Sequence, residues 1–391
     1  MAEARYLEGR IREDLARKMV FVAGPRQVGK TTLAKRLLAE SPGGVYLDWD
    51  NRSDRRDLRA ARWPGGEALV VLDEIHKWRP WKGWLKGEID RHGGILRFLV
   101  TGSARLDVYR RGGDSLQGRY HHYRLHPFSL AEAAGMRPGK EVEVFRGLPV
   151  PPRGGPEDMG HLMERGGFPE PFLAPSARAH RRWQKERLDR FFREDVRDLE
   201  TVRDLGSLQI LADLLPERVG SPLSLNALRE DLEVSHRAVT HWMEILDRLY
   251  HAFRVRPFAP ARARTLRKMA KAYLWDWSLV PGPGPRFENL VASHLLKFCH
   301  WLEDAEGHRA ELWYLRDRAG REVDFLVTVD RRPWFAVEAR VSDADIAPAL
   351  RHYRDAFRIP FAYQVVFEGD RDFVEDGVRC LPAGRFLAAL A

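Results

Sequence analysis

Residues 24–31 read Gly-Pro-Arg-Gln-Val-Gly-Lys-Thr and follow the apolar run Met-Val-Phe-Val-Ala at residues 19–23. The segment matches the pattern G-x-x-x-x-G-K-[ST], placed between a predicted strand and a predicted helix. In that setting a glycine-rich turn aims backbone N–H groups and a helix N-terminus at an anion. A tight strand-to-helix turn without a ligand is the alternative interpretation. The segment predicts a nucleoside triphosphate site at the carboxyl end of a strand.

Each residue type in this phosphate loop has a predicted role. Gly24 and Gly29 let the backbone turn tightly around phosphates, and the Lys30 ammonium reaches the β- and γ-phosphates. The Thr31 hydroxyl helps to hold Mg²⁺, which is therefore an expected cofactor. The loop contacts phosphates only and leaves adenine and guanine undistinguished. The predicted nucleotide-binding residues are Gly24, Pro25, Arg26, Gln27, Val28, Gly29, Lys30, Thr31 and Thr32.

A second apolar run, residues 68–72, ends in the carboxylates Asp73 and Glu74. A buried parallel strand delivers such residues to the carboxyl edge of its sheet. Asp73 is predicted to hold the Mg²⁺ shell together with Thr31, and Glu74 to polarise the attacking water. Strands also often end in acidic turns, so the pair alone is weak evidence. Because it follows a phosphate loop, it indicates nucleotide hydrolysis.

A third run, residues 96–100, leads into Thr101-Gly102-Ser103. The hydroxyls of Thr101 and Ser103 are predicted to sense the γ-phosphate or to position water, while the alternative is a helix cap for Ala104 onward. Apolar segments at residues 18–23, 44–49, 68–72, 96–101 and 121–125 alternate with helical stretches. This alternation predicts an α/β P-loop NTPase core with a parallel sheet.

Further blocks of sequence follow in a fixed order. They are Leu-Gln-Gly-Arg (116–119), Leu-His-Pro-Phe-Ser-Leu-Ala-Glu (125–132), Gly-Gly-Phe-Pro-Glu (166–170), Arg-Glu-Asp-Val (193–196), Lys-Ala-Tyr-Leu-Trp-Asp (271–276), Phe-Glu-Asn (287–289) and Gly-Arg-Glu-Val-Asp-Phe-Leu-Val (320–327). Together with the phosphate loop and the two strand ends, they resemble the AAA-type ATPases fused to a DUF4143 C-terminal region. The resemblance covers nearly the whole chain. It implies ATP as the nucleotide, ATP hydrolysis, and a homo-oligomer such as a hexameric ring.

The same resemblance places the Gly-Arg block where subunits of a ring meet. It makes Arg119 the candidate arginine finger, which stabilises transition-state charge on a neighbour's γ-phosphate. Arg105, just past the third strand, is the competing candidate. Either side chain also fits a solvated or capping arginine.

The composition sets outer bounds on the protein class. With 391 residues, 44% hydrophobic and 31% charged, the chain is expected to fold as two or three soluble domains. Two cysteines, Cys299 and Cys380, are too few for a disulfide framework or a thiolate zinc site. The chain shows no apolar run of membrane-spanning length and no signal-peptide core, so the cytoplasm is the expected location and no membrane partner is expected. The net charge of +9 mildly favours a polyanionic partner.

Residues 223–258 have the pattern of a winged helix-turn-helix, with Ser235 as the cap of a second helix and a strand after it. This helix is expected to expose side chains suited to DNA contact. A basic run follows and adds candidate phosphate contacts. The predicted DNA-binding residues are His236, Arg237, Thr240, His241, Arg262, Arg264, Arg267, Lys268 and Lys271. Such modules also bind proteins, which leaves a protein partner as the alternative.

The last part of the chain resembles the PD-(D/E)xK nucleases through Glu288, Asp324 and Glu338. In that pattern the carboxylates bind a divalent metal and a lysine activates water. Arg340 stands where the lysine is expected, and a guanidinium cannot act as a base. The sequence therefore predicts a degenerate nuclease-like domain and argues against metal-dependent cleavage.

These inferences combine into one organisation. We predict an AAA-type ATPase core (1–130), a helical lid and linker (131–215), a winged helix-turn-helix (216–275) and an α/β nuclease-like domain (276–391). The predicted function is ATP hydrolysis coupled to remodelling of, or movement on, DNA, with branched DNA as a candidate substrate by analogy. The alternatives are a slow regulatory switch with a protein partner and, less favoured, an ATP-gated nuclease. The predicted catalytic residues are Lys30, Asp73, Glu74, Thr101, Ser103 and Arg119.

Overall fold

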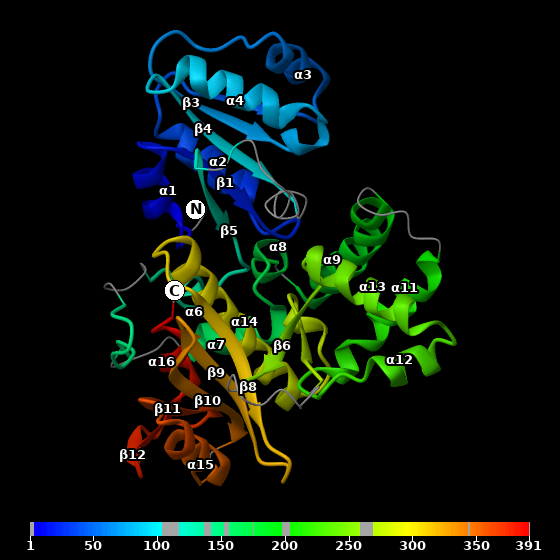
Figure 1. Cartoon of the computed structure of the whole chain (residues 1–391), viewed down its shortest axis with the longest axis vertical. Helices are drawn as coiled ribbons and strands as arrows, with labels where there is room; N and C mark the ends of the chain where they lie inside the picture. Colours follow the sequence, from blue (N-terminus) through cyan, green and yellow to red (C-terminus); the bar gives the residue numbers. More distant parts are fainter. Residues whose placement is uncertain are drawn as a thin grey trace. The chain divides into compact units, whose positions relative to one another are not determined.

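The structure is a computed structural model that describes residues 4–103, 116, 118–136, 142–151, 156–174, 176–197, 204–258, 269–342 and 345–390. The chain divides into two compact units, Met1–His126 (unit 1) and Pro127–Ala391 (unit 2) (Figure 1). The division lies close to the predicted end of the ATPase core at residue 130. Within the described residues, no helix is both long enough and apolar enough to cross a bilayer.

Unit 1 is built on a parallel sheet of five strands in the order β2-β3-β4-β1-β5. The strands are β1 (Met19–Ala23), β2 (Val45–Asp48), β3 (Ala68–Asp73), β4 (Leu96–Gly102) and β5 (Tyr120–Arg124). The register pairs Asp48 with Asp73 and Asp73 with Thr101. The polar ends of three neighbouring strands therefore meet at one edge of the sheet, as the alternating sequence pattern predicts.

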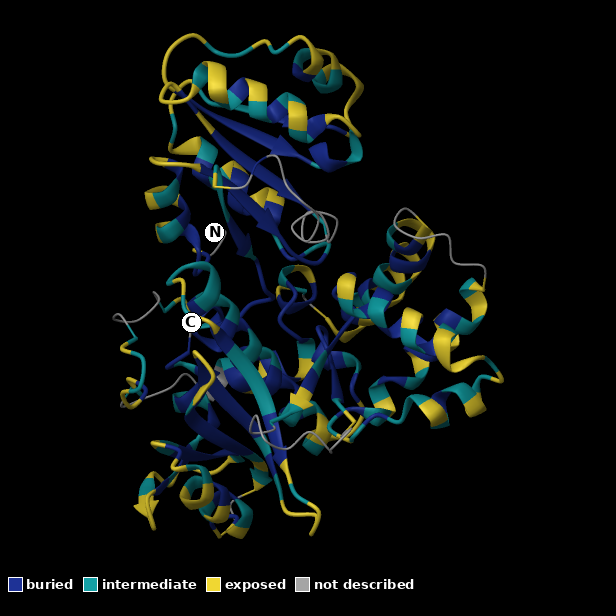
Figure 2. Ribbon diagram, viewed as in Figure 1, coloured by how far each residue is buried: buried dark blue, intermediate teal, exposed yellow. Residues whose placement is uncertain are grey.

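Helices connect these strands. They are α1 (Glu8–Leu15), α2 (Lys30–Ala39), α3 (Arg52–Arg59), the short η1 (Ile75–Lys77) and α4 (Trp81–His92). Both faces of the sheet are covered, because β1 and β3 are buried at every residue. Figure 2 shows the buried strands inside and the exposed residues along the outer helix faces.

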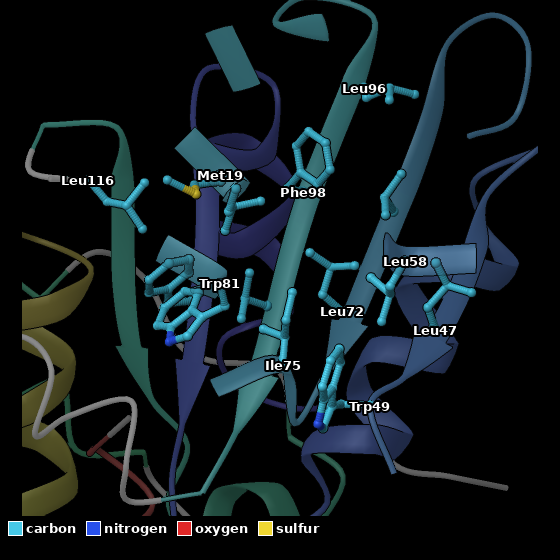
Figure 3. Packing of buried hydrophobic residues seen from close by; sticks show 14 of the residues in the cluster. Met19, Leu47, Trp49, Leu58, Leu72, Ile75, Trp81, Leu96, Phe98 and Leu116 are labelled. Atoms are coloured by element: carbon cyan, nitrogen blue, oxygen red, sulfur yellow. The ribbon is translucent and has the colours of Figure 1, made fainter. Parts of the chain in front are cut away.

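One apolar cluster fixes the sheet face that carries α4. Met19 of β1 belongs to this cluster with Phe98 of β4 and Trp81 of α4 (Figure 3). Phe21, two residues after Met19, packs in the same cluster, with its ring centroid 5.8 Å from that of Trp81. Trp49, which follows β2, stacks on Trp78 with ring centroids 5.2 Å apart. Large aromatic side chains contribute most to such cores because each removes a wide apolar area from water. The packing holds the segments after β2 and β3 against each other.

Unit 2 begins with helices and continues into a mixed sheet. The helical elements before the sheet are α6 (Leu130–Ala133), α7 (Pro156–Arg165), α8 (Pro169–Phe172), α9 (Ala177–Arg190), η2 (Phe191–Val196), α11 (Leu205–Leu214), η3 (Pro216–Arg218), α12 (Leu225–Asp231) and α13 (His236–Arg248). One of the arginines of α9 is buried against aromatic and acidic side chains. Arg187 is 11% exposed, lies 4.2 Å from the Phe168 ring centroid and sits 3.7 Å from Asp276 Oδ2.

The sheet of unit 2 has eight strands in the order β12-β13-β11-β10-β9-β8-β6-β7. Its strands are β6 (Ala252–Pro257), β7 (Lys271–Leu274), β8 (Ala310–Arg316), β9 (Glu322–Val329), β10 (Arg332–Ser342), β11 (Phe361–Glu368), β12 (Phe373–Glu375) and β13 (Val378–Pro382). The accompanying helices are η4 (Trp277–Leu279), α14 (Pro283–Asp304), α15 (Pro348–Phe357) and α16 (Ala383–Leu387). Helix α14 packs on the sheet against β8 and β10.

The predicted helix-turn-helix is present as α12 and α13. Ser224 and Ser235 cap the two helices through their hydroxyls, which accept from the backbone N–H groups of Ala227 and Ala238. Strands β6 and β7 pair antiparallel, as a wing would, but β6 also pairs with β8 in parallel. The ribbon is thus the edge of the unit 2 sheet, and the predicted boundary at residue 275 divides a continuous sheet.

The Gly-Gly-Phe-Pro-Glu block has a packing role in unit 2. The backbone N–H of Phe128 donates to the Gly167 carbonyl at 2.6 Å. A Cβ atom on Gly167 would lie 2.5 Å from Trp277 Cη2 and 2.6 Å from the Phe128 carbonyl oxygen. Only glycine fits this close approach, so packing alone accounts for a small residue here.

Candidate nucleotide site and carboxylate cluster

The phosphate loop lies between β1 and α2. Gly29 has φ 97° at the start of α2, in the left-handed region that favours glycine. At Gly24 a Cβ atom would meet the Leu125 carbonyl oxygen at 2.4 Å. Helix α2 has no side-chain cap, which leaves its first-turn N–H groups directed at the loop. The loop therefore has the backbone geometry of an anion site.

Two cations hold this loop. The Lys30 ammonium is buried and donates to the Gly24 and Pro25 carbonyl oxygens at 2.9 and 2.7 Å. From the N-terminal segment, Arg5 donates to the Val28 carbonyl oxygen at 2.7 Å. Sequence reasoning assigned Lys30 but missed Arg5, because no motif marks an isolated arginine at that distance along the chain.

The Asp73 carboxylate is the centre of the site. It is 5% exposed, and its Oδ2 atom accepts hydrogen bonds from Thr31 Oγ1 at 2.9 Å and from the Tyr46 hydroxyl at 2.5 Å. Its Oδ1 atom accepts from Thr101 Oγ1 at 2.6 Å. The predicted residues Thr31, Asp73 and Thr101 are thus in direct contact. Tyr46 was missed, since a tyrosine inside a strand carries no motif.

Glu74 follows Asp73 in the left-handed conformation, with φ 56°. Its backbone N–H donates to the Thr101 carbonyl at 3.0 Å. Its carboxylate Oε2 lies 3.3 Å from Lys77 Nζ and 3.6 Å from Nε2 of the buried His76. Burial raises the pKa of Glu74, against the opposing effect of the Lys77 ammonium. The predicted base is therefore held by two side chains that the sequence did not reveal.

Three further predicted residues of unit 1 differ in their exposure. Ser103 is half-buried at the end of β4, and Thr32 is exposed on α2. Arg119 Nε lies 3.2 Å from Asp90 Oδ1, and its side chain is 37% exposed. The alternative candidate Arg105 lies outside the described residues. A finger role for Arg119 requires a neighbouring subunit and stays a prediction.

The residues present fit a magnesium ion bound together with nucleotide phosphates. The Thr31 hydroxyl and the Asp73 carboxylate are oxygen donors, and their nearest oxygens are 2.9 Å apart. Hard oxygen ligands of this kind suit Mg²⁺, which takes one or two protein groups and completes its shell with phosphates and water. Thr31 and Asp73 would hold the ion.

The nuclease-like residues of unit 2 also come together. Strands β9 and β10 place Asp324 and Glu338 side by side, because the Asp324 N–H donates to Glu338 Oε2 at 3.3 Å. The Ala339 N–H donates in return to Asp324 Oδ2 at 3.0 Å. Arg340 lies 2.6 Å from Glu338 Oε1 and is half-exposed.

The carboxylate cluster consists of Glu288, Glu322, Asp324 and Glu338, and Lys271 contacts the first three. Its Nζ atom lies 3.1 Å from Glu288 Oε1, 2.7 Å from Glu322 Oε1 and 3.6 Å from Asp324 Oδ1. The side chain is 1% exposed. The prediction that Lys271 contacts DNA is therefore wrong, because the sheet pairing of β7 turns this lysine inward, where it neutralises acids.

The metal site that active nucleases of the PD-(D/E)xK pattern form does not fit the arrangement of Glu288, Asp324 and Glu338 in this chain. Among the described residues, no group of three or more His, Cys, Asp or Glu side chains has the arrangement of a metal site. The Lys271 ammonium stands where a cation would have to sit. The pKa of Glu288 is raised to about 7 and that of Glu338 to about 8. Burial is the larger cause in both, and the nearby Asp324 carboxylate is the second. We derive no metal-dependent step from these residues.

Family models match three consecutive parts of the chain. Residues 16–134 match an AAA domain, residues 156–281 match a domain of unknown function (DUF8612), and residues 283–386 match a domain of unknown function (DUF4143). The chain joins an AAA domain to a DUF4143 domain. The predicted resemblance is confirmed, and the middle segment matches a model that sequence reasoning did not name.

Relatives extend over most of the chain. An uncharacterized protein of Mycobacterium tuberculosis is 24% identical over 406 residues, covering 99% of this chain and 85% of the relative. An uncharacterized protein of Methanocaldococcus jannaschii is 22% identical over 372 residues, covering 87% and 79%. Among solved structures, the Walker-type ATPase of Pyrococcus abyssi aligns with a TM-score of 0.43 and 14% identity, over 70% of this chain and 93% of that chain.

The boundary between the DUF8612 and DUF4143 matches runs through the carboxylate cluster. Lys271 lies in the first match, whereas Glu288 and Asp324 lie in the second. A buried ion pair that joins both segments makes each dependent on the other for charge neutralisation. The two matches therefore describe one folded sheet of unit 2.

Unit 2 is expected to lose stability as the pH rises from about 5 to about 8. The pKa of Glu338 is about 8 in the folded state against an ordinary value of 4.5, so the folded protein binds the extra proton between these values. The stabilisation is complete below pH 4.5 and is lost as the pH passes through the folded pKa. Hydrogen-exchange protection factors of the β9 and β10 amides at several pH values, compared between wild type and Glu338→Gln, measure this term. Parallel profiles in the two proteins would contradict it.

Helix α13 presents the predicted DNA-contact residues on its outer face. His236, Arg237 and His241 are exposed, and the Thr240 hydroxyl donates to the His236 carbonyl at 2.8 Å. The opposite face buries apolar residues such as Met243. The other predicted contacts, Arg262, Arg264, Arg267 and Lys268, lie outside the described residues.

Proposed function

We propose that the AAA domain hydrolyses ATP and that the energy released moves or remodels DNA bound by unit 2. The observation that carries the first part is the contact of Asp73 with Thr31 and Thr101 beside the phosphate loop. A carboxylate at the end of β3, hydrogen-bonded to the hydroxyl after the loop lysine, is the arrangement that P-loop hydrolases need.

In the proposed hydrolysis, different residues bind the phosphates, hold the metal ion and accept the proton of the attacking water. Lys30 and the α2 N-terminus bind the phosphates, and Lys30 leaves two carbonyl oxygens to do so. Mg²⁺, held by Thr31 and Asp73, would supply charge neutralisation at the β- and γ-phosphates. Glu74 accepts a proton from the attacking water, and burial makes its carboxylate a stronger base than a solvated one.

A second subunit completes this proposed site. Arg119 is partly exposed and pairs with Asp90 at the surface of unit 1. In a homo-oligomeric ring, such as a hexamer, it would reach a neighbour's γ-phosphate. Breaking the Arg119–Asp90 pair to reach a phosphate costs little free energy, because an exposed ion pair contributes less than about 1 kcal/mol.

DNA is the proposed partner of unit 2. The exposed face of α13 carries Arg237 and two histidines, and the chain has a net charge of +9. Helices of this kind enter the major groove, and cations add affinity through the phosphates.

The second candidate function is a slow switch that acts through a protein partner. The contact between Lys77 and the Glu74 carboxylate favours it, because a carboxylate that is paired with a lysine is less available to take a proton from water.

Steady-state ATP turnover tests the proposal. We expect turnover to rise several-fold with duplex or four-way-junction DNA, and Lys30→Ala to abolish it in every condition. Arg237→Ala combined with His241→Ala should remove the stimulation and leave basal turnover unchanged. The matched control is Arg248→Ala, an exposed arginine at the other end of α13. Turnover that no DNA changes would favour the protein-partner switch, and absent turnover would refute the hydrolase itself.

A further inference from the structure

We infer that Tyr46 is a positioning residue of the nucleotide site, which fixes the Asp73 carboxylate for Mg²⁺-dependent nucleotide binding. This inference rests on the proposed ATP and Mg²⁺ site and deepens it. Neither the phosphate loop pattern nor the strand-end carboxylates assign a role to this residue.

The first support is the hydrogen-bonding capacity of Asp73. A carboxylate oxygen offers two lone-pair sites, and Oδ2 accepts from both Thr31 and Tyr46. A hydroxyl at 2.5 Å from an ionised acceptor makes a short, charge-assisted bond. Tyr46 therefore holds the same oxygen that contacts Thr31, the predicted metal ligand.

The second support is that donors flank Asp73 from different elements. Tyr46 comes from β2, Thr101 from β4 and Thr31 from α2. The carboxylate cannot rotate about its Cβ–Cγ bond without breaking at least one of these bonds. Loss of the Tyr46 hydroxyl leaves Oδ2 with one partner and removes the donor on the β2 side.

The third support is that Tyr46 is itself held in place. The Trp49 N–H donates to the Asp73 carbonyl at 2.9 Å, which ties the segment after β2 to the end of β3. The Lys35 ammonium lies 5.0 Å from the Tyr46 ring centroid. A fixed donor is what positioning requires.

The test measures nucleotide affinity with and without the metal, using a fluorescent ATP analogue and the full-length protein. Tyr46→Phe should weaken binding in Mg²⁺ by about three- to tenfold, the loss of one charge-assisted hydrogen bond. Binding in EDTA should stay within about twofold of wild type, because the phosphate loop is untouched. In an Asp73→Asn background, Tyr46→Phe should add no further loss, since both changes act through one carboxylate.

Tyr123→Phe is the matched control. Its hydroxyl donates to Asp14 Oδ2 at 2.5 Å in the same unit, so the change removes an equivalent bond away from the site. Equal losses in Mg²⁺ and EDTA for Tyr46→Phe, or additive losses with Asp73→Asn, would overturn the positioning role. Wild-type protein that binds no nucleotide in either buffer would instead refute the proposed function.

Discussion

Glu74→Gln is expected to lower ATP turnover by about a hundredfold or more while nucleotide binding persists. The amide keeps the shape of the side chain but cannot accept a proton from water. The carboxylate stands directly after Asp73 at the carboxyl edge of the sheet, where burial raises its pKa. Phosphate release under saturating ATP measures the loss, and a fluorescent ATP analogue measures the retained binding.

The control for this change is Glu67→Gln, the same substitution at an exposed residue just before β3. It should leave turnover within about twofold of wild type, since exposed substitutions rarely change function or stability. Near-normal turnover by Glu74→Gln would show that another group activates the water. Loss of nucleotide binding in the same variant would show that Glu74 is needed to bind the nucleotide before any reaction occurs.

Lys271→Met is expected to destabilise unit 2 by about 3–5 kcal/mol, the usual effect of removing one partner from a buried ion pair. The ammonium is 1% exposed and lies within 3.6 Å of Glu288, Glu322 and Asp324. Without it, these carboxylates repel one another. Because the pKa of Glu288 is already about 7, protonation relieves part of the repulsion at low pH. The destabilisation should therefore be larger at pH 8.5 than at pH 6.

Hydrogen exchange of the β7 and β9 amides in the full-length protein follows this change locally. A local probe is needed because a chain of two units does not unfold in a single two-state transition. Arg309→Met is the control, since it removes a cation from a surface pair with Glu311. Unchanged protection in Lys271→Met at pH 8.5 would mean that solvent, and not the lysine, neutralises the cluster.

Much of unit 1 could be predicted from the sequence because its signals are local. The phosphate loop needs Gly24, Gly29 and Lys30 within one turn, and the neighbours along the chain decide whether it follows a strand. Asp73 and Thr101 each end an apolar run, and parallel strands of similar length bring such ends together. Their contact at 2.6 Å follows from that arrangement.

The helix pair of unit 2 was also predictable, because Ser235 and the apolar spacing of α13 mark a cap and a buried face. The pairing of the β6–β7 ribbon that follows these helices could not be predicted. Whether β6 and β7 form a free wing or the edge of a larger sheet depends on pairing with β8, more than fifty residues further along. Composition gives no signal for such a choice.

The sequence by itself determined the phosphate loop, the strand ends that carry Asp73 and Thr101, and the order of the domains, because these depend on short segments and their periodicity. Only the tertiary structure decided the partner of each buried charge. Tyr46 reaches Asp73 across 27 residues, and Lys271 reaches Glu288 across 17 and turns a predicted DNA contact into a buried ion pair. The physical reason is desolvation: a charge removed from water takes whichever opposite group the fold brings within hydrogen-bonding distance, and that distance is set by packing.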